Sequence, residues 1–411
     1  MKTILVTAYA VNPYKGSEDG TGWNLVGQIA RYNKVIVVTR ENNQPAIEKY
    51  IHENPETVHA NQIRFLYFDL PYWMRFWKKG ERGAMLYFYL WQFFMPGFIK
   101  KSKVVYDIVH NLNFHNDWTP TFLWRLKKPL VWGPIGHHPK APAEYMYRAN
   151  GQIEYFKSRV LWFVKNVFWT CDPFLHMALK SADKIICMNS GVEKINAFPK
   201  QKIVHMSAVA AESVIGLELN PQKEYFTVLS VGRLVPLKGF DITLKAFYEF
   251  YSGLSLHQQK NVRLQLVGKG QLLKSIKKQI AELSLEDSVI LTEWVEKEKM
   301  KDIYTNASVF FFPSHEGAGM VVPEALSFGL PVVCFDNEGP GEFIDSSCGL
   351  KVTYSTYDES LKVFANQLKL LYEDRTLYEK LSAGALHKFN STFDWNVKGQ
   401  ILKKVYDSLI H

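Results

Sequence analysis

The chain contains little cysteine and no long uninterrupted apolar run. Its 411 residues include four cysteines: Cys171, Cys187, Cys334 and Cys348. No two of them are spaced as CxxC, which excludes the common paired-cysteine metal and redox sites. Scattered cysteines also exclude a small disulfide-stapled scaffold and are typical of a protein in a reducing compartment.

Segments for export or membrane insertion are missing as well. Residues 1–10 form a short β-like run and lack the charged start, apolar stretch and cleavage site of a signal peptide. The aromatic-rich stretch 84–99 is interrupted by Gln92, Pro96 and Gly97 and is too short to span a bilayer. We therefore expect a cytoplasmic protein.

The composition is that of a folded protein with an uneven charge. Hydrophobic residues make up 47% and aromatic residues 14% of the chain, enough to build a core, and the length suggests two domains or one long domain. Residues 1–220 hold 27 Lys and Arg against 17 Asp and Glu, and the remainder holds 22 against 23. The basic half indicates either an anionic partner or a solvated surface. No nucleic-acid-binding signature accompanies it, so we expect no nucleic acid.

Strand-like and helix-like segments alternate along the whole chain. The expected strands are residues 2–8, 35–39, 64–68, 106–110, 129–132 and 184–188, followed by residues 226–231, 263–267, 288–291, 308–312 and 331–335. Such alternation predicts parallel sheets with helices on both faces. Two series of strands predict two doubly wound α/β domains, with a boundary near residues 208–223 and a last amphipathic helix over 395–410.

The first motif that can carry chemistry follows an expected strand, over residues 230–239. Its glycines, Gly232 and Gly239, allow the chain to turn. Arg233 offers a planar fork of donors that suits phosphate oxygens, and Lys238 adds a point charge near the next helix. Two solvated basic residues are the alternative, but their position and pairing favour a phosphate site.

The second motif covers residues 313–326 and also follows an expected strand. Gly317 and Gly319 free the backbone so that amides can face an anion. Glu316 lies in the loop and Glu324 one to two turns into a helix that begins near Met320. Either glutamate alone could be a helix cap or a surface residue. Together they are better interpreted as acceptors for sugar and ribose hydroxyls.

These motifs resemble the glycosyltransferase family 4 group of GT-B enzymes. The similar segments are GRLVPLKG (232–239), LQLVGKG (264–270) and HEGAGMVVPEALSFGLPVV (315–333), which cover most of the second half. Residues 9–23 and 131–136 are similar to the openings of a bacterial surface-polysaccharide branch. The resemblance implies two Rossmann-like domains facing a cleft: an acceptor domain (1–207, with helix 395–411) and a donor domain (208–394).

The resemblance also implies roles for individual residues. Arg233 and Lys238 would hold the diphosphate of a nucleoside diphosphate sugar, Glu316 the sugar hydroxyls, and Glu324 the ribose. His110, at a strand end, would contact sugar or acceptor; a structural histidine is the alternative. The remaining donor-site residues would be Gly16, Gly232, Gly317, Ala318, Gly319, Met320, Val321 and Trp294. Such enzymes retain the anomeric configuration and need no metal, and we expect no cofactor; no cluster with metal-ligand spacing is present in the sequence.

The sequence departs from the family pattern on the acceptor side. Ala318 stands where many relatives have an aromatic residue, and His137 and His138 stand where the branch continues with glycines and a glutamate. His115, His137 and His138 are interpreted as structural or acceptor-lining residues. Glu18 and Asp19 could act on the acceptor hydroxyl, with a solvated loop equally plausible.

Residues 71–103 are rich in aromatic and basic side chains. They include 11 aromatic residues and seven Lys or Arg, against one acid, Glu81. This composition suits the interface of an anionic membrane, but the aromatics could equally pack helices on the sheet, and the two interpretations stay open.

The function expected from all of these features is transfer of a sugar from a nucleoside diphosphate sugar to a hydroxyl of a glycan or lipid-linked acceptor. Retention would proceed by same-face attack assisted by the leaving phosphate, because no first-domain carboxylate is placed as a nucleophile. The product would be an extracellular or capsular polysaccharide or a lipopolysaccharide, made at the inner face of the membrane. A sugar-nucleotide epimerase or a phosphorylase on the same fold is the alternative. An exported binding protein is disfavoured by the missing signal peptide.

Overall fold

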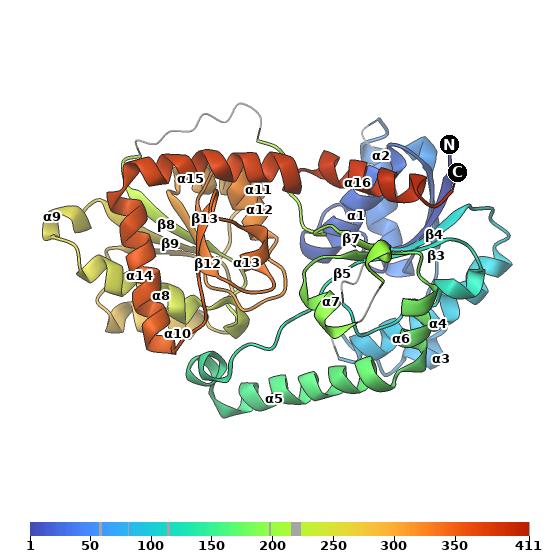
Figure 1. The fold of residues 1–411 in the computed structure, drawn as a ribbon, viewed down its shortest axis with the longest axis horizontal. Coiled ribbons are helices and arrows are strands. Elements are labelled where there is room, and N and C mark those ends of the chain that lie inside the picture. Colours follow the sequence, from blue (N-terminus) through green and yellow to red (C-terminus); the bar gives the residue numbers. More distant parts are fainter. Residues whose placement is uncertain (57–59, 81, 113–115, 197–198, 215–222, 411) are drawn as a thin grey trace. The chain divides into compact units, whose positions relative to one another are not determined.

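The computed structural model describes the chain except residues 57–59, 81, 113–115, 197–198, 215–222 and 411. Its contacts divide the chain into two compact units, which are described separately (Figure 1). The first unit comprises Met1–His137, Trp162–Ala210 and Trp395–His411. The second unit comprises His138–Leu161 and Ala211–Asp394.

The first unit is built on a parallel sheet of seven strands in the order β3-β2-β1-β4-β5-β6-β7. The strands are β1 (Thr3–Thr7), β2 (Lys34–Thr39), β3 (Ile63–Tyr67), β4 (Ile108–Asn111), β5 (Leu130–Ile135), β6 (Lys184–Cys187) and β7 (Ile203–His205). Along β1, Ile4 and Val6 belong to one apolar cluster and Leu5 to another, so both faces of the sheet are covered. A strand that is buried on both faces has a continuous run of apolar residues, and such a run predicts β1 from the sequence.

Helices cover both faces of this sheet. They are α1 (Ser17–Ala30), α2 (Gln44–Glu53), α3 (Tyr72–Arg75), α4 (Ala84–Lys101), α6 (Pro173–Ser181), α7 (Gly191–Ile195) and α16 (Trp395–Asp407), with the end of α5 (Ala143–Cys171). The last helix, α16, packs against α1, and Lys2 bonds to Tyr406 and Asp407 at its end. The C-terminal helix therefore belongs to the first unit, as the resemblance implies.

The second unit repeats this architecture with six parallel strands in the order β10-β9-β8-β11-β12-β13. The strands are β8 (Phe226–Val231), β9 (Val262–Val267), β10 (Val289–Thr292), β11 (Val309–Phe312), β12 (Val332–Phe335) and β13 (Gly349–Val352). The helices are α8 (Phe240–Ser252), α9 (Leu256–Gln259), α10 (Leu273–Glu282), α11 (Lys297–Asn306), α12 (Val321–Ser327), α13 (Pro340–Phe343), α14 (Tyr357–Glu373) and α15 (Arg375–Lys388).

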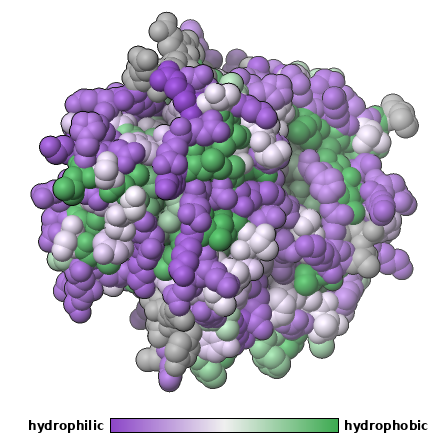
Figure 2. Space-filling model, turned by 60° about the vertical axis from the view of Figure 1, so that its left-hand side comes forward, coloured by the Kyte–Doolittle hydropathy of each residue, from purple (hydrophilic) through white to green (hydrophobic). Residues whose placement is uncertain are grey.

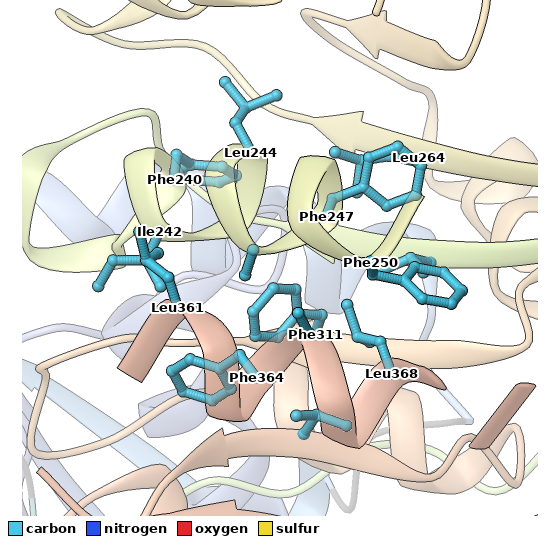
Figure 3. Close-up of a cluster of buried hydrophobic side chains, with 14 of the residues drawn as sticks. Phe240, Ile242, Leu244, Phe247, Phe250, Leu264, Phe311, Leu361, Phe364 and Leu368 are labelled. Atoms are coloured by element: carbon cyan, nitrogen blue, oxygen red, sulfur yellow. The ribbon is translucent and has the colours of Figure 1, made fainter. Parts of the chain in front are cut away.

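The core of the second unit lies where α8 and α14 meet the sheet. Figure 3 shows Phe247 on α8, Phe364 on α14 and Phe311 on β11 within one cluster of buried side chains. The two doubly wound domains expected from the sequence are thus both present.

The glycine-rich opening differs from its prediction. The resemblance implies a glycine-rich loop over residues 16–22, whereas α1 begins at Ser17 and includes Gly20 and Gly22. Two acids, Glu18 and Asp19, lie in its first turn, where the helix dipole favours negative charge. Burial of Thr21 and Leu25 on one face favours the helix further, which offsets the poor helix propensity of glycine.

Residues 138–161 belong to the second unit, although the resemblance implies a first domain over residues 1–207. The physical reason is Tyr145, which is buried in the core of the second unit. Its hydroxyl lies 2.6 Å from Oγ of Ser360. Contacts between residues so distant in sequence leave no trace in local periodicity.

The surface carries hydrophobic side chains in several places. On the face shown in Figure 2, they are interspersed among hydrophilic ones. Among the described residues, no helix combines the length and apolar character that crossing a bilayer requires.

Candidate active site

The candidate donor site lies at the carboxyl ends of β8 and β11, which are neighbours in the second sheet. Successive strands run outward in one direction from β8 and in the other from β11. Ligands of open α/β sheets bind at such a reversal of strand order. The two motifs found in the sequence, residues 230–239 and 313–326, are the segments that follow these two strands.

Hydrogen bonds join the loops at this point. The amide of His315 and the hydroxyl of Ser314 both donate to the carbonyl of Leu237, at 2.9 and 3.1 Å. Asn337, which follows β12, donates from Nδ2 to the carbonyl of Ser314 at 2.8 Å. Hydrogen bonds therefore connect the segments that follow the three adjacent strands β8, β11 and β12.

Gly239 is required by the close approach of these two loops. Its φ of +70° lies in the left-handed region that side-chain-bearing residues avoid. A Cβ at this position would lie 2.2 Å from the carbonyl oxygen of Pro313. The glycine thus places Lys238 directly against the loop that carries Glu316.

Lys238 and Glu316 form an ion pair at the centre of the site. Lys238 Nζ lies 2.6 Å from Glu316 Oε1, and the two side chains are 13% and 17% exposed. The ammonium also lies 4.8 Å from the centre of the Phe312 ring. Burial raises the pKa of Glu316, while Lys238 and then Arg233 oppose the shift by favouring the carboxylate.

Arg233 extends this positive region to the surface. The residue is exposed, and its charge acts on the Glu316 carboxylate. A buried ammonium and an accessible guanidinium beside one carboxylate leave a net positive charge. Such an arrangement can hold an anionic group whose oxygens need several donors.

The chain between the two glutamates turns into α12. Residues 317–320 precede the helix, and Met320 is its N-cap residue. Val321 opens the helix and Glu324 lies in its first turn. The hydroxyl of Tyr304 donates to Glu324 Oε2 at 2.9 Å, which fixes the carboxylate from α11.

Glycine is also needed between the glutamates. A Cβ on Gly319 would lie 3.0 Å from the Phe312 ring and 3.4 Å from Glu316 Oε1. Gly317, Ala318 and Gly319 therefore give the loop little bulk beside the carboxylate. Gly232 lies at the end of β8, where a Cβ would touch the aliphatic part of Lys238 at 3.5 Å.

The other expected residues lie on the edge of the second sheet or in the first unit. Trp294 is 66% exposed and follows β10, the edge strand, which is separated from β8 by β9. Gly16 and His110 belong to the first unit. Gly16 is the exposed N-cap residue of α1.

His110 has the contacts of a structural histidine. It is completely buried on β4. Its Nε2 lies 2.6 Å from the carbonyl of Gly133 and its Nδ1 2.6 Å from the hydroxyl of Tyr406. The carbonyl can only accept, so Nε2 carries the proton. Burial lowers the pKa of His110 to about 4. A catalytic role would require both hydrogen bonds to break. His115 lies outside the described residues, and His138 is exposed.

Sequence reasoning missed the residues that support the donor loops. His315 is buried, and its Nδ1 lies 2.8 Å from the hydroxyl of Tyr354. Tyr145 packs against its ring from the segment 138–161. Asn337 could have been found, because it is a polar residue directly after an expected strand. Nothing local marks Tyr145.

Comparison with known proteins agrees with this geometry. Residues 217–388 match the family described as glycosyl transferases group 1. Mannosylfructose-phosphate synthase of Agrobacterium fabrum is 29% identical over 177 residues, which are 41% of this chain and 37% of that protein. The amylovoran biosynthesis glycosyltransferase AmsK of Erwinia amylovora is 26% identical over 184 residues, 40% and 44% of the two chains. These alignments span less than half of either relative.

The whole chain is similar in fold to solved glycosyltransferase structures. HepE of Anabaena, solved in complex with UDP, matches over 100% of both chains with a TM-score of 0.64 at 16% identity. At this identity the likeness concerns the fold. The chain therefore has the GT-B fold, and its residues 217–388 are similar to the group 1 glycosyl transferases.

Proposed function

We propose that the protein is a retaining glycosyltransferase that uses a nucleoside diphosphate sugar as donor. The observation that carries this proposal is the ion pair of Lys238 and Glu316, with Arg233 beside it, at the reversal of strand order. It combines cations for a diphosphate with a carboxylate for sugar hydroxyls. HepE supports the donor class, because its structure was solved with UDP.

The chemistry of these residues suits departure of a nucleotide. Negative charge develops on the diphosphate oxygens as the glycosidic bond breaks, and fixed cations stabilise that charge in the transition state. Lys238 has three N–H donors, of which Glu316 takes one, so the ammonium can reach a phosphate oxygen without leaving its partner. Arg233 can add two parallel hydrogen bonds.

The remaining donor contacts follow from the same placement. Glu316 accepts hydroxyls of the transferred sugar and Glu324 those of the ribose. The amides of residues 317–320 face the diphosphate, with Gly232 at the end of β8 and Val321 at the start of α12. Trp294 lies in the segment that reads the base, and Gly16, the N-cap residue of α1, is the donor contact from the first unit.

The cationic groups also make a metal ion unnecessary. Lys238 and Arg233 neutralise charge that Mg²⁺ would otherwise carry. Transfer with retention then proceeds by attack on the same face as the departing phosphate, which takes the acceptor proton. The acceptor is a glycan or lipid-linked hydroxyl in polysaccharide or lipopolysaccharide synthesis, a role in line with the name of AmsK.

A panel of UDP-, GDP-, ADP- and dTDP-sugars tests the proposal. One donor should raise the melting temperature and be hydrolysed slowly by the wild type, both with and without EDTA. Lys238→Met should lose most of this binding, because the diphosphate loses its buried cation. Glu316→Gln should lower turnover far more than nucleotide affinity.

Three outcomes would contradict parts of the proposal. Absence of binding by every donor would refute the donor site. Loss of activity in EDTA would refute metal independence. Formation of a second sugar nucleotide without transfer would favour an epimerase, and dependence on inorganic phosphate a phosphorylase.

We further propose that the protein works at an anionic membrane surface. In segment 71–103, Tyr87, Phe88 and Trp91 are buried in the core, whereas Trp73 and Phe76 on and after α3 are 71% and 59% exposed. Exposed aromatics beside lysines suit a headgroup interface. The proposed membrane contact is therefore limited to α3 and the residue that follows it, rather than to all of segment 71–103.

Vesicle co-sedimentation tests this contact. The wild type should bind vesicles of 30% anionic lipid and release them at high salt. A Trp73→Ser, Phe76→Ser double variant should bind about tenfold more weakly. Leu256→Ser on α9, which is 80% exposed in the second unit, is the matched control. Equal binding by all three proteins would rule out α3.

A further inference from the structure

A second group of buried polar side chains lies at the strand ends of the first unit. Three adjacent strands, β4, β5 and β6, are followed by Asp117, His137 and Asn189. Lys165 and Trp169 reach the same place from α5. All five side chains belong to residues less than 10% exposed. None of them is part of the donor site.

The position of His137 is fixed through both its backbone and its side chain. Its amide donates to Oδ1 of Asn189 at 3.1 Å, and Nδ2 of Asn189 donates to its carbonyl at 2.8 Å. Its Nδ1 lies 2.8 Å from Oδ2 of Asp117. Trp169 packs on the ring and donates its indole N–H to the carbonyl of Asp117. An imidazole restrained in this way is pre-organised for a ligand.

The hydrogen bond to Asp117 decides which nitrogen of His137 carries the proton. A carboxylate can only accept, so Nδ1 bears the hydrogen. In the neutral ring, Nε2 then has a free lone pair. The residue is 4% exposed, and Nε2 has no hydrogen-bond partner within the described part of the chain. Nε2 is not among the fully buried unpaired atoms of the described residues, so a donor group from outside the fold can reach it.

Lys165 supplies the complementary donor. It lies one turn before Trp169 on α5, so both project from the same face of the helix. Burial lowers its pKa, and the Asp117 carboxylate opposes the shift, which places Lys165 near that carboxylate.

We propose that this cluster is a sugar-binding site. In it, Nε2 of His137 accepts a hydrogen bond from a sugar hydroxyl, and Lys165 donates a hydrogen bond to a neighbouring oxygen of the same sugar. A vicinal diol fits, because it offers a donor and an acceptor side by side. Asp117 is a positioning residue that acts through the imidazole. Binding of the sugar does not depend on the proposed function; its identity as the acceptor substrate rests on that proposal.

Imidazole NMR of the full chain labelled with ¹⁵N-histidine tests the site directly. The Nε2 signal of His137 is assigned by its loss in His137→Phe, which keeps a ring against Trp169. Methyl glycosides of glucose, galactose and mannose are the probes. We expect at least one to move the Nε2 signal saturably. No movement with any glycoside, at concentrations up to 100 mM, would overturn the proposal.

Two variants separate binding from a merely structural role. Asp117→Asn should reverse the tautomer, because its amide can donate to Nδ1, so that Nε2 becomes protonated and the dissociation constant rises at least tenfold. Lys165→Met should weaken binding similarly while leaving the tautomer unchanged. His176→Gln, an exposed histidine on α6, is the control and should bind normally. Unchanged affinity in both site variants would refute the assignment.

Nucleotide-sugar binding by the same samples distinguishes the two proposals. His137→Phe should bind the donor as the wild type does, since Arg233, Lys238 and Glu316 lie in the second unit. Glycoside binding without donor binding would sustain this site and refute the proposed function. Donor binding without glycoside binding would support the proposed function and refute this sugar-binding site.

Discussion

Burial holds His110 and His315 neutral, which makes stability depend on pH. The pKa of each is lowered to about 4. An unfolded histidine takes up its proton near pH 6.5, whereas these residues do so only near pH 4. Between those values the unfolded state binds more protons. The free energy of unfolding should therefore fall as the pH is lowered from 6.5 to 4.

His315→Phe tests this at the donor loops. Phenylalanine can keep the stacking on Phe335 and Tyr354 but cannot titrate. The wild type should lose about 1.4 kcal/mol per pH unit more than the variant over this range. The measurement is urea unfolding at pH values between 7 and 4.5, monitored with a probe that reports on the second unit. Parallel pH profiles for the two proteins would contradict the assignment.

At the residue scale, candidate chemistry was easier to predict than structural support. The two glycine-containing motifs and the resemblance single out Arg233, Lys238, Glu316 and Glu324 as candidates. The contacts of His110 were not predictable, since Tyr406 lies 296 positions away in the sequence. The pairing of Asp117 with His137 was likewise not predictable, although both residues follow strands.

At the element scale, the loop between β8 and α8 depends on one backbone conformation. Gly239→Ala places a Cβ 2.2 Å from the Pro313 carbonyl at a φ of +70°. We expect a loss of about 2 kcal/mol or more in the free energy of unfolding, and weaker nucleotide binding because Lys238 shifts. Chemical denaturation and donor titration measure both effects.

Gly97→Ala is the matched control for that substitution. Gly97 lies within α4, and nothing lies within 4 Å of an added Cβ. Alanine should be neutral or stabilising by up to about 1 kcal/mol, because it lowers the entropy of the unfolded chain. Equal losses in both variants would show that the close approach to Pro313 has no special effect.

Most strands were predictable, and two edge strands were not. The apolar runs predict eleven strands within about three residues of their ends, because most of them are buried on both faces. The two missed strands, β7 (Ile203–His205) and β13 (Gly349–Val352), lie at the edges of their sheets. β7 has only three residues, and β13 begins with a glycine and contains Lys351, so neither carries a clear apolar run.

At the scale of the whole molecule, α16 closes the first unit. Leu402 is completely buried in the cluster that contains Leu25 and Val26 of α1. Leu402→Ala should lower the free energy of unfolding of the first unit by about 2–5 kcal/mol. Nucleotide affinity in the second unit should not change. Urea unfolding and donor titration give the two values.

Lys403→Ala controls for the adjacent position. Lys403 is exposed and pairs with Asp407, an interaction that contributes about 0.5 kcal/mol or less. A loss as large as that of Leu402→Ala would mean that α16 is held by its charges rather than by its buried face.

Segment 138–161 shows which part of the domain organisation could not be predicted. Local composition places a boundary well at 208–223, where apolar periodicity ceases. It cannot show that Tyr145 joins the second core, because the bond from its hydroxyl to Ser360 spans 215 positions. Neither unit is consequently one continuous stretch of chain.

The pairing of α16 with α1 has a consequence for synthesis on the ribosome. Lys2 meets its hydrogen-bond partner Tyr406 only after 404 further positions have been translated. The second unit, whose last residue is Asp394, emerges before α16 does. The apolar face of α1 that includes Leu25 therefore cannot be covered by α16 until the rest of the chain has been synthesised. The first unit to begin is the last that can finish folding, and its nascent form is where chaperones would be needed most.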